Sequence, residues 1–283
     1  IASDPTNGNQ YICVDGILHL FDRRNLNLNR IGVSCGSSGG SNDQAVSDDQ
    51  AVYVVSGGNV LRLPHDGTSW QTIYGGGDAS EIFVHTRNYL IVYTSYTSPG
   101  LKAVKKDGSG TVITLSTSSV HLTVATSDKV FFTEVTIGGG GVVTSIKACE
   151  WSEGSLSPTC SDNSYWAGAS LATSGTVNTS GGILIPIYRL LRVDGVDLTN
   201  GYPSGGTLRA VNPSDGSTTD LGTVPNDFFV FGSGVGDHLL LRGIDHVNNQ
   251  NDVFYVNLSS PNSLQNLTNT TNSSEYPIFL ERR

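Results

Sequence analysis

The chain has 283 residues, of which 37% are hydrophobic and 14% are charged, and its formal net charge is −9 at pH 7. The apolar content excludes a disordered chain, and the acidic balance argues against nucleic acid as a partner. The strongest apolar run, residues 181–191, is too short and too interrupted by Pro186 and Arg189 to span a bilayer, so we expect no membrane span. The chain begins at Ile1 and contains no methionine, which we interpret as a processed mature form or a trimmed chain.

Polar turns recur along the chain, each flanked by runs in which apolar and polar residues alternate. In chain order they lie at residues 24–25, 66–67, 107–108, 153–154, 215–216 and 261–262. The four that pair an acidic residue with glycine are separated by 41, 46 and 62 residues. Alternation with period two around such a turn predicts a β-hairpin at each position.

Two more strand-like segments precede the hairpin in several units. They are residues 80–86 and 88–95, 120–126 and 128–135, and 228–233 and 237–244. A four-stranded unit that repeats about every 40–50 residues is typical of a β-propeller blade. We therefore predict an all-β fold, a six-bladed β-propeller of four-stranded antiparallel blades, formed as a single domain by residues 1–283.

The end of the chain resembles a strand that belongs before its beginning. Residues 276–283, YPIFLERR, are similar to SEIFVHTR at 80–87, and the strand expected to follow them is QYICVDG from Gln10. We expect this C-terminal strand to close the ring as the innermost strand of the first blade, because closure removes exposed edge strands. Two stacked sandwiches, or an open fragment of a larger propeller, are the alternatives.

Four cysteines form two close pairs, Cys13 with Cys35 and Cys149 with Cys160. Three connectivities are formally open, but the short loops favour these local disulfides. Disulfides predict an extracytoplasmic location, secreted, cell-surface or periplasmic; four free thiols in a cytosolic protein are the alternative. Sequons for N-glycosylation point the same way in a glycosylating organism and lie at Asn178, Asn257, Asn266, Asn269 and Asn272.

The interval before the fifth hairpin is longer than its neighbours, which indicates an insertion at about residues 186–206. Long loops in compact domains are often functional, and aromatic, aliphatic and arginine side chains together suit a protein contact. We predict that the contact residues are Ile187, Tyr188, Arg189, Leu190, Leu191, Arg192 and Tyr202. A hairpin extension that packs on its own blade is the alternative.

Other candidate sites carry weaker signals. The loop with Asp245, Asn248, Asn249 and Asp252 is dense in oxygen ligands for Ca²⁺, although a long polar turn explains it as well. No other cofactor is expected. The polar residues of predicted inner strands are His85, His121, Glu281 and Arg282, where a hydrogen-bonded structural role is the simpler interpretation. The cluster of Lys102, Lys105 and Lys106 is interpreted as a solvated strand face, and the indoles of Trp70, Trp151 and Trp166 as covers for outer sheet faces.

The blade length and the turn NPSDGS at 212–217 resemble bacterial TolB-like six-bladed propellers. The resemblance implies an extracytoplasmic location and protein–protein contact without catalysis, and it assigns no functional residue. We therefore expect a non-catalytic secreted or cell-surface propeller that acts as a protein-binding or assembly module. A propeller hydrolase or lyase with its active site at the channel mouth, and a carbohydrate-binding propeller, are the alternatives.

Overall fold

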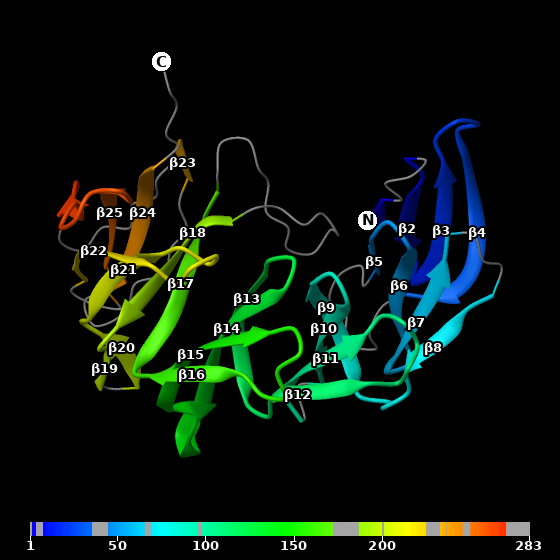
Figure 1. The fold of residues 1–283 in the computed structure, drawn as a ribbon, viewed down its shortest axis with the longest axis horizontal. Helices are drawn as coiled ribbons and strands as arrows, with labels where there is room; N and C mark the ends of the chain where they lie inside the picture. Colours follow the sequence, from blue (N-terminus) through cyan, green and yellow to red (C-terminus); the bar gives the residue numbers. More distant parts are fainter. Residues whose placement is uncertain are drawn as a thin grey trace.

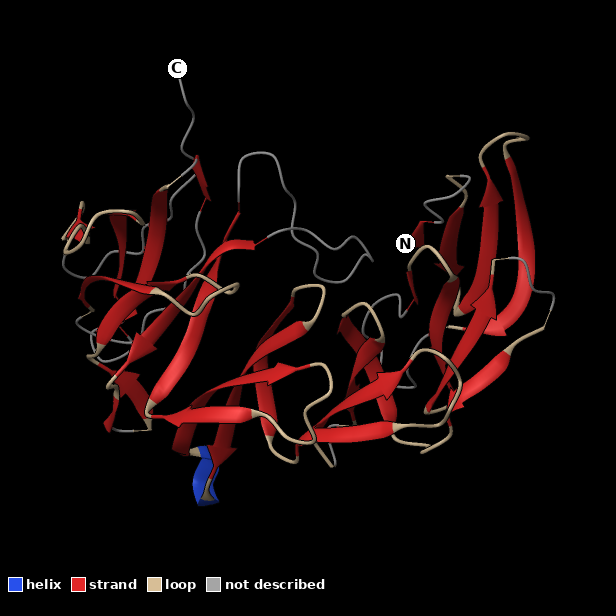
Figure 2. Ribbon diagram, viewed as in Figure 1, coloured by secondary structure: helices blue, strands red, loops and turns tan. Residues whose placement is uncertain are grey.

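A computed structural model describes residues 2–3, 8–35, 45–65, 69–95, 98–171, 187–199, 201–224, 233–235, 237–245 and 250–269. These residues form antiparallel β-sheets and one short 3₁₀ turn, η1 (Gly139–Gly141), as Figures 1 and 2 show. No helix in this described part is long and apolar enough to cross a membrane.

Within the described residues, six sheets of four strands follow one another along the chain. The first three contain β1 (Ala2–Ser3), β2 (Gln10–Val14), β3 (Ile17–Asp22) and β4 (Asn27–Ser34); β5 (Ala45–Ser47), β6 (Ala51–Ser56), β7 (Asn59–Pro64) and β8 (Gln71–Tyr74); and β9 (Ala79–His85), β10 (Tyr89–Thr94), β11 (Leu101–Lys105) and β12 (Val112–Ser116).

The last three sheets contain β13 (Ser119–Ala125), β14 (Lys129–Ile137), β15 (Val143–Ser152) and β16 (Thr159–Asp162); β17 (Ser164–Leu171), β18 (Ile187–Asp194), β21 (Thr207–Val211) and β22 (Thr218–Thr223); and β23 (Ser233–Val235), β24 (His238–Asp245), β25 (Gln250–Asn257) and β26 (Gln265–Asn266). A separate two-stranded hairpin, β19 (Asp197–Thr199) with β20 (Tyr202–Ser204), lies between β18 and β21. The all-β prediction and the antiparallel four-stranded units are confirmed.

The sheets stand around an arc with their first strands toward its centre, from the first sheet on one side to the sixth on the other (Figure 1). Clusters of buried apolar side chains fill the space between successive sheets. Strands with a sheet on either side, such as β6 and β10, are therefore buried on both faces and read as continuous apolar runs. Outer strands such as β4 are mostly exposed.

The predicted hairpins join the third and fourth strands of each sheet. They correspond to β3–β4, β7–β8, β11–β12, β15–β16, β21–β22 and β25–β26. Asp107 and Asp215 each accept the backbone N–H two residues ahead, and the glycines that follow them, Gly108 and Gly216, have positive φ. The repeated Asp-Gly pair therefore reflects the geometry of the turn.

The expected closing strand, residues 276–283, lies outside the described residues. In the structure the innermost position of the first sheet is held by β1, which pairs with β2 at Gln10 and Tyr11. In the described part of the chain, no apolar cluster joins the sixth sheet to the first. Closure of the ring therefore remains a prediction.

Candidate functional sites on the two faces of the sheets

Because neighbouring strands are antiparallel, the turns lie at one or the other of the two opposite ends of the strands, which we call face A and face B. Face A carries the turns between the first and second strands and between the third and fourth strands of each sheet. Face B carries the turns between the second and third strands and the connections from one sheet to the next. The turn after β5 and the turn after β11 thus lie on face A, and the β19–β20 hairpin lies on face B.

The predicted insertion, residues 186–206, begins at residue 186, which lies outside the described residues, and continues into a regular strand. Residues 187–194 are the regular strand β18, and the added structure is the β19–β20 hairpin with its flanking glycines. Leu190 and Leu191 are fully buried in the core, so the prediction that they face a partner is wrong. Their apolar run is that of a strand covered on both faces.

The arginines of this region differ in their surroundings. Arg192 lies over the Trp166 ring, 5.4 Å from its centroid, and its Nε is 2.8 Å from Asp194 Oδ1. Arg209 contacts both Asp194, at 2.8 Å, and Asp220, at 2.6 Å. This network joins β18, β21 and β22, so Arg192 supports the fifth sheet. Arg189 is half-buried, and the side chains of Ile187 and Tyr188 lie outside the described ones.

Tyr202 is the predicted contact residue that the structure exposes, with 49% of its surface accessible. It follows Gly201, whose α-carbon faces Val142: a methyl group built there would lie 2.8 Å from Val142 Cγ1. Val142 and Ile137 flank η1 at the tip of the β14–β15 hairpin and are 47% and 52% exposed. The two hairpin tips therefore meet on face B, and η1 projects beyond the sheets (Figure 2).

We call Ile137, Val142 and Tyr202 the hairpin-tip patch. The predicted residues of the insertion contribute one of its three members. Ile137 and Val142 were not predicted, although apolar residues on both sides of the run Gly138–Gly141 were a usable signal. Leu198 of β19 is partly buried and packs against the core beneath. Apolar side chains over a polar rim that includes Asp197 are the composition of a small protein-contact surface.

A second polar cluster is buried on face A between the second and third sheets. Lys106 is 5% exposed, and its Nζ lies 2.8 Å from the carboxylate of Asp48. The ammonium also donates to the carbonyl of Thr86 at 2.7 Å and lies 3.1 Å from His85 Nδ1. Lys106 is thus not part of a solvated strand face. The sequence gives no signal for this pair, because its partners belong to different sheets.

Burial and the neighbouring charges act in opposite directions on the pKa values of Asp48 and Lys106. Burial raises the pKa of Asp48, but Lys106 and the backbone N–H groups of Gln50 and Ala51 outweigh it, so the pKa lies below its usual value. Burial lowers the pKa of Lys106 against the influence of Asp48. The hydroxyl of Tyr53 donates to the same carboxylate at 3.2 Å, and burial with the Asp48 charge raises the Tyr53 pKa. Because the cluster is buried and hydrogen-bonded, we interpret it as a structural connection between the second and third sheets.

A related contact joins the third and fourth sheets on face A. The carboxylate of Glu153, after β15, accepts hydrogen bonds from the Thr86 hydroxyl and from the backbone and side-chain N–H groups of Asn88. The two Asn88 bonds measure 2.8 and 2.7 Å. Glu153, the acidic residue of the fourth repeated turn, therefore connects its own sheet with the third sheet.

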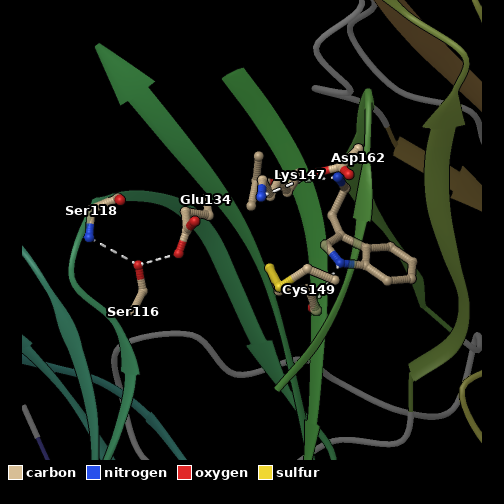
Figure 3. Close-up of a disulfide and its surroundings, with 9 residues drawn as sticks. Ser116, Ser118, Glu134, Lys147, Cys149 and Asp162 are labelled. Carbon is tan, nitrogen blue, oxygen red and sulfur yellow. Dashed lines mark hydrogen bonds and ion pairs between the residues drawn. A yellow bond between two sulfur atoms is a disulfide. The ribbon is translucent and has the colours of Figure 1, made fainter. Parts of the chain in front are cut away.

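The structure pairs Cys13 with Cys35 and Cys149 with Cys160. Cys149 and Cys160 lie directly opposite each other on β15 and β16, with their α-carbons 4.0 Å apart. Around this bridge, Lys147 pairs with Asp162 across the same strands, and Glu134 accepts a hydrogen bond from Ser116 of the preceding sheet (Figure 3). Trp166 of the next sheet donates its indole N–H to the carbonyl of Cys149 at 3.0 Å.

The remaining predicted sites find limited support. Asn248 and Asn249 lie outside the described residues, as do Glu281, Arg282 and the side chain of Asp245. Asp252 accepts hydrogen bonds from Asn266 and Thr268. Among the described residues, no group of three or more His, Cys, Asp and Glu side chains could hold a metal.

Of the residues considered for a channel site, His85 belongs to the Lys106 cluster and His121 is exposed on β13. The indoles of Trp151 and Trp166 are buried between sheets, at 1% and 5% exposure, and Trp70 is half-buried. Their expected position on outer sheet faces is therefore wrong for Trp151 and Trp166.

No protein-family model matches the sequence, and no curated protein matches it. Solved structures match in fold. Dipeptidyl peptidase 4 of Porphyromonas gingivalis aligns over 93% of this chain and 44% of its own, with a TM-score of 0.51 and 8% identity. An oligogalacturonate lyase in complex with manganese aligns over 98% of this chain and 78% of its own, with a TM-score of 0.47 and 12% identity. YCF48 bound to a D1 peptide aligns over 94% of this chain and 80% of its own, with a TM-score of 0.46 and 10% identity. The chain resembles propeller proteins at the level of the fold.

Proposed function

We propose that this protein is an extracytoplasmic β-propeller that binds a partner protein through the hairpin-tip patch and does not act as a catalyst. The observation that carries the proposal is the exposure of Ile137, Val142 and Tyr202 where two hairpins from neighbouring sheets meet. An aromatic residue together with aliphatic residues on two adjacent hairpins is the composition that anchors protein contacts. Both disulfides support the extracytoplasmic location, because such bonds persist in oxidising compartments.

The proposal includes a ring of six blades closed by residues 276–283. In the described part of the chain, β1 pairs with only the first two residues of β2, so the inner edge of Ile12–Val14 has no partner strand. A strand from the C-terminal segment would continue that sheet and cover the edge. The similarity of residues 276–283 to β9, itself an innermost strand, supports this assignment.

Partner capture from the natural source, followed by binding measurements with the purified partner, tests the function. The wild-type protein is compared with Ile137→Ser/Tyr202→Ser on face B and with Leu156→Ser on face A, where Leu156 is 88% exposed in the β15–β16 turn. We expect the double variant to bind the partner at least tenfold more weakly, since two anchors are lost. Leu156→Ser should bind as the wild type does. The wild type and both variants should share one thermal midpoint of unfolding. Equal binding by the double variant and wild type would reject the hairpin-tip patch as the contact surface.

A further inference from the structure

Asn266 combines a sequon with an exposed position on an outermost strand. Its sequon is Asn266-Leu267-Thr268, and the residue lies on β26, the last strand of the sixth sheet. The side chain is exposed, and so is that of Leu267, at 54%. N-linked glycans require an accessible asparagine in a chain that passes through an oxidising secretory compartment, which the two disulfides also indicate.

The hydrogen bonds of Asn266 leave room for such a modification. Its Oδ1 accepts the backbone N–H groups of Thr268 and Asn269, at 3.1 and 2.9 Å. Its Nδ2 donates to Asp252 Oδ2 at 2.8 Å. An asparagine amide has two N–H bonds, and a glycan replaces one. The remaining N–H is sufficient for the Asp252 contact, so the local structure is compatible with a sugar on Asn266.

The sequon at Asn257 offers a contrast within the same sheet. Asn257 is half-buried at the end of β25, and its backbone N–H and C=O both bond to Ser263, at 3.1 and 2.7 Å. The hydroxyl of its sequon residue Ser259 donates to Asp237. The hydroxyl of Thr268, in the sequon of Asn266, donates to Asp252 in the same way. The two sites therefore differ in the exposure of the asparagine itself, which is half-buried at Asn257 and exposed at Asn266.

We propose that Asn266 carries an N-linked glycan, which covers the outer edge of the sixth sheet. In the reaction, Asn266 Nδ2 bonds to the anomeric carbon of a lipid-pyrophosphate-linked oligosaccharide. The bond from that carbon to the pyrophosphate oxygen breaks, and the lipid pyrophosphate leaves while the amide proton is released to a base of the glycosyltransferase. An exposed edge strand with an apolar residue invites pairing with another chain, and a bulky hydrophilic group there opposes it.

The first test is glycopeptide mass spectrometry of the protein from its natural source. Treatment with an N-glycosidase converts a glycosylated asparagine to aspartate, so the peptide that contains residue 266 is expected to carry this change and the Asn257 peptide is not. An Asn266 that stays unmodified in the protein from its natural source would overturn the proposal.

Two variants secreted by the same source provide the matched control. Asn266→Gln is expected to lose the mass of one glycan, whereas Thr268→Ser, which keeps the hydroxyl and the sequon, retains it. Analytical ultracentrifugation then compares native and enzymatically deglycosylated protein. Self-association of the deglycosylated protein alone supports the covering role, and the same association state in both forms would refute it.

Discussion

Lys106 and Asp48 tie the second and third sheets together through an ion pair that is almost entirely buried. Their exposed fractions are 5% and 12% at the side chain, and the atoms that meet are 2.8 Å apart. A buried pair does not by itself guarantee stability, because both charges lose their hydration. Removing one partner is costly all the same, since the other charge is left in the interior. Lys105, the preceding residue, forms an exposed pair with Asp107 and provides a comparison within one turn.

We expect Lys106→Met to lower the free energy of unfolding by about 3–5 kcal/mol, because Asp48 loses its ionic partner. Lys105→Met is expected to cost far less than Lys106→Met, since the pair of Lys105 with Asp107 is exposed. Urea unfolding at pH 7 followed by fluorescence measures both. The double variant Asp48→Asn/Lys106→Met should lose less than the sum of the two single variants. Equal losses for the two lysine variants would contradict the burial of Lys106.

At the scale of elements, each disulfide joins strands of a single sheet. The bridge between Cys149 and Cys160 closes the β15–β16 hairpin, whose turn includes Glu153 and the exposed Leu156. Cys13 and Cys35 connect β2 with the residue that follows β4, where the Cys35 N–H donates to Gly16 at 2.9 Å. Each bridge therefore fixes one sheet internally and leaves the contacts between sheets to apolar packing and ion pairs.

Replacing Cys149 and Cys160 together by serine is expected to lower the free energy of unfolding by about 3 kcal/mol, the value for a loop of similar length. The physical reason is the greater freedom of the unfolded chain. Denaturant unfolding without reductant provides the measurement. The control is wild type with reductant, which should lose more because both bridges open. A serine variant as stable as wild type would mean that this bridge does not form in solution.

Sequence patterns predicted the turns better than the surfaces. Asp-Gly turns have a local cause, so the hairpin positions followed directly from residues such as Asp107 and Asp215. Burial depends on the neighbouring sheets, which the sequence does not display. Leu190 and Leu191 therefore looked like a contact surface but are core, and Lys106 looked solvated but is buried. Tyr202 is exposed, as a contact residue needs to be, but its contact with a partner remains a prediction, and the tip of the neighbouring hairpin belongs to another sheet.

At the scale of the whole molecule, successive sheets form an arc whose ends are the first and sixth sheets (Figure 1). Each interior sheet packs on two neighbours, and the clusters that join them account for most of the buried apolar side chains. The proposed closing strand would give the first and last sheets the same arrangement. It also would join the two ends of the chain in one sheet, so that opening the ring exposes apolar surface on both sides.

Deletion of residues 276–283 tests closure directly. If these residues complete the first sheet, the shortened protein should unfold at lower urea concentration and lose cooperativity, because the end sheets become free to separate. Small-angle X-ray scattering should give about 19 Å for the radius of gyration of the intact protein, the value for a compact chain of this length, and a larger one after deletion. A matched variant that replaces Ile278, Phe279 and Leu280 by serine keeps the length and removes the apolar strand character. Closure predicts that it behaves like the deletion. If both variants match wild type in midpoint and radius, the ring is not closed by this segment.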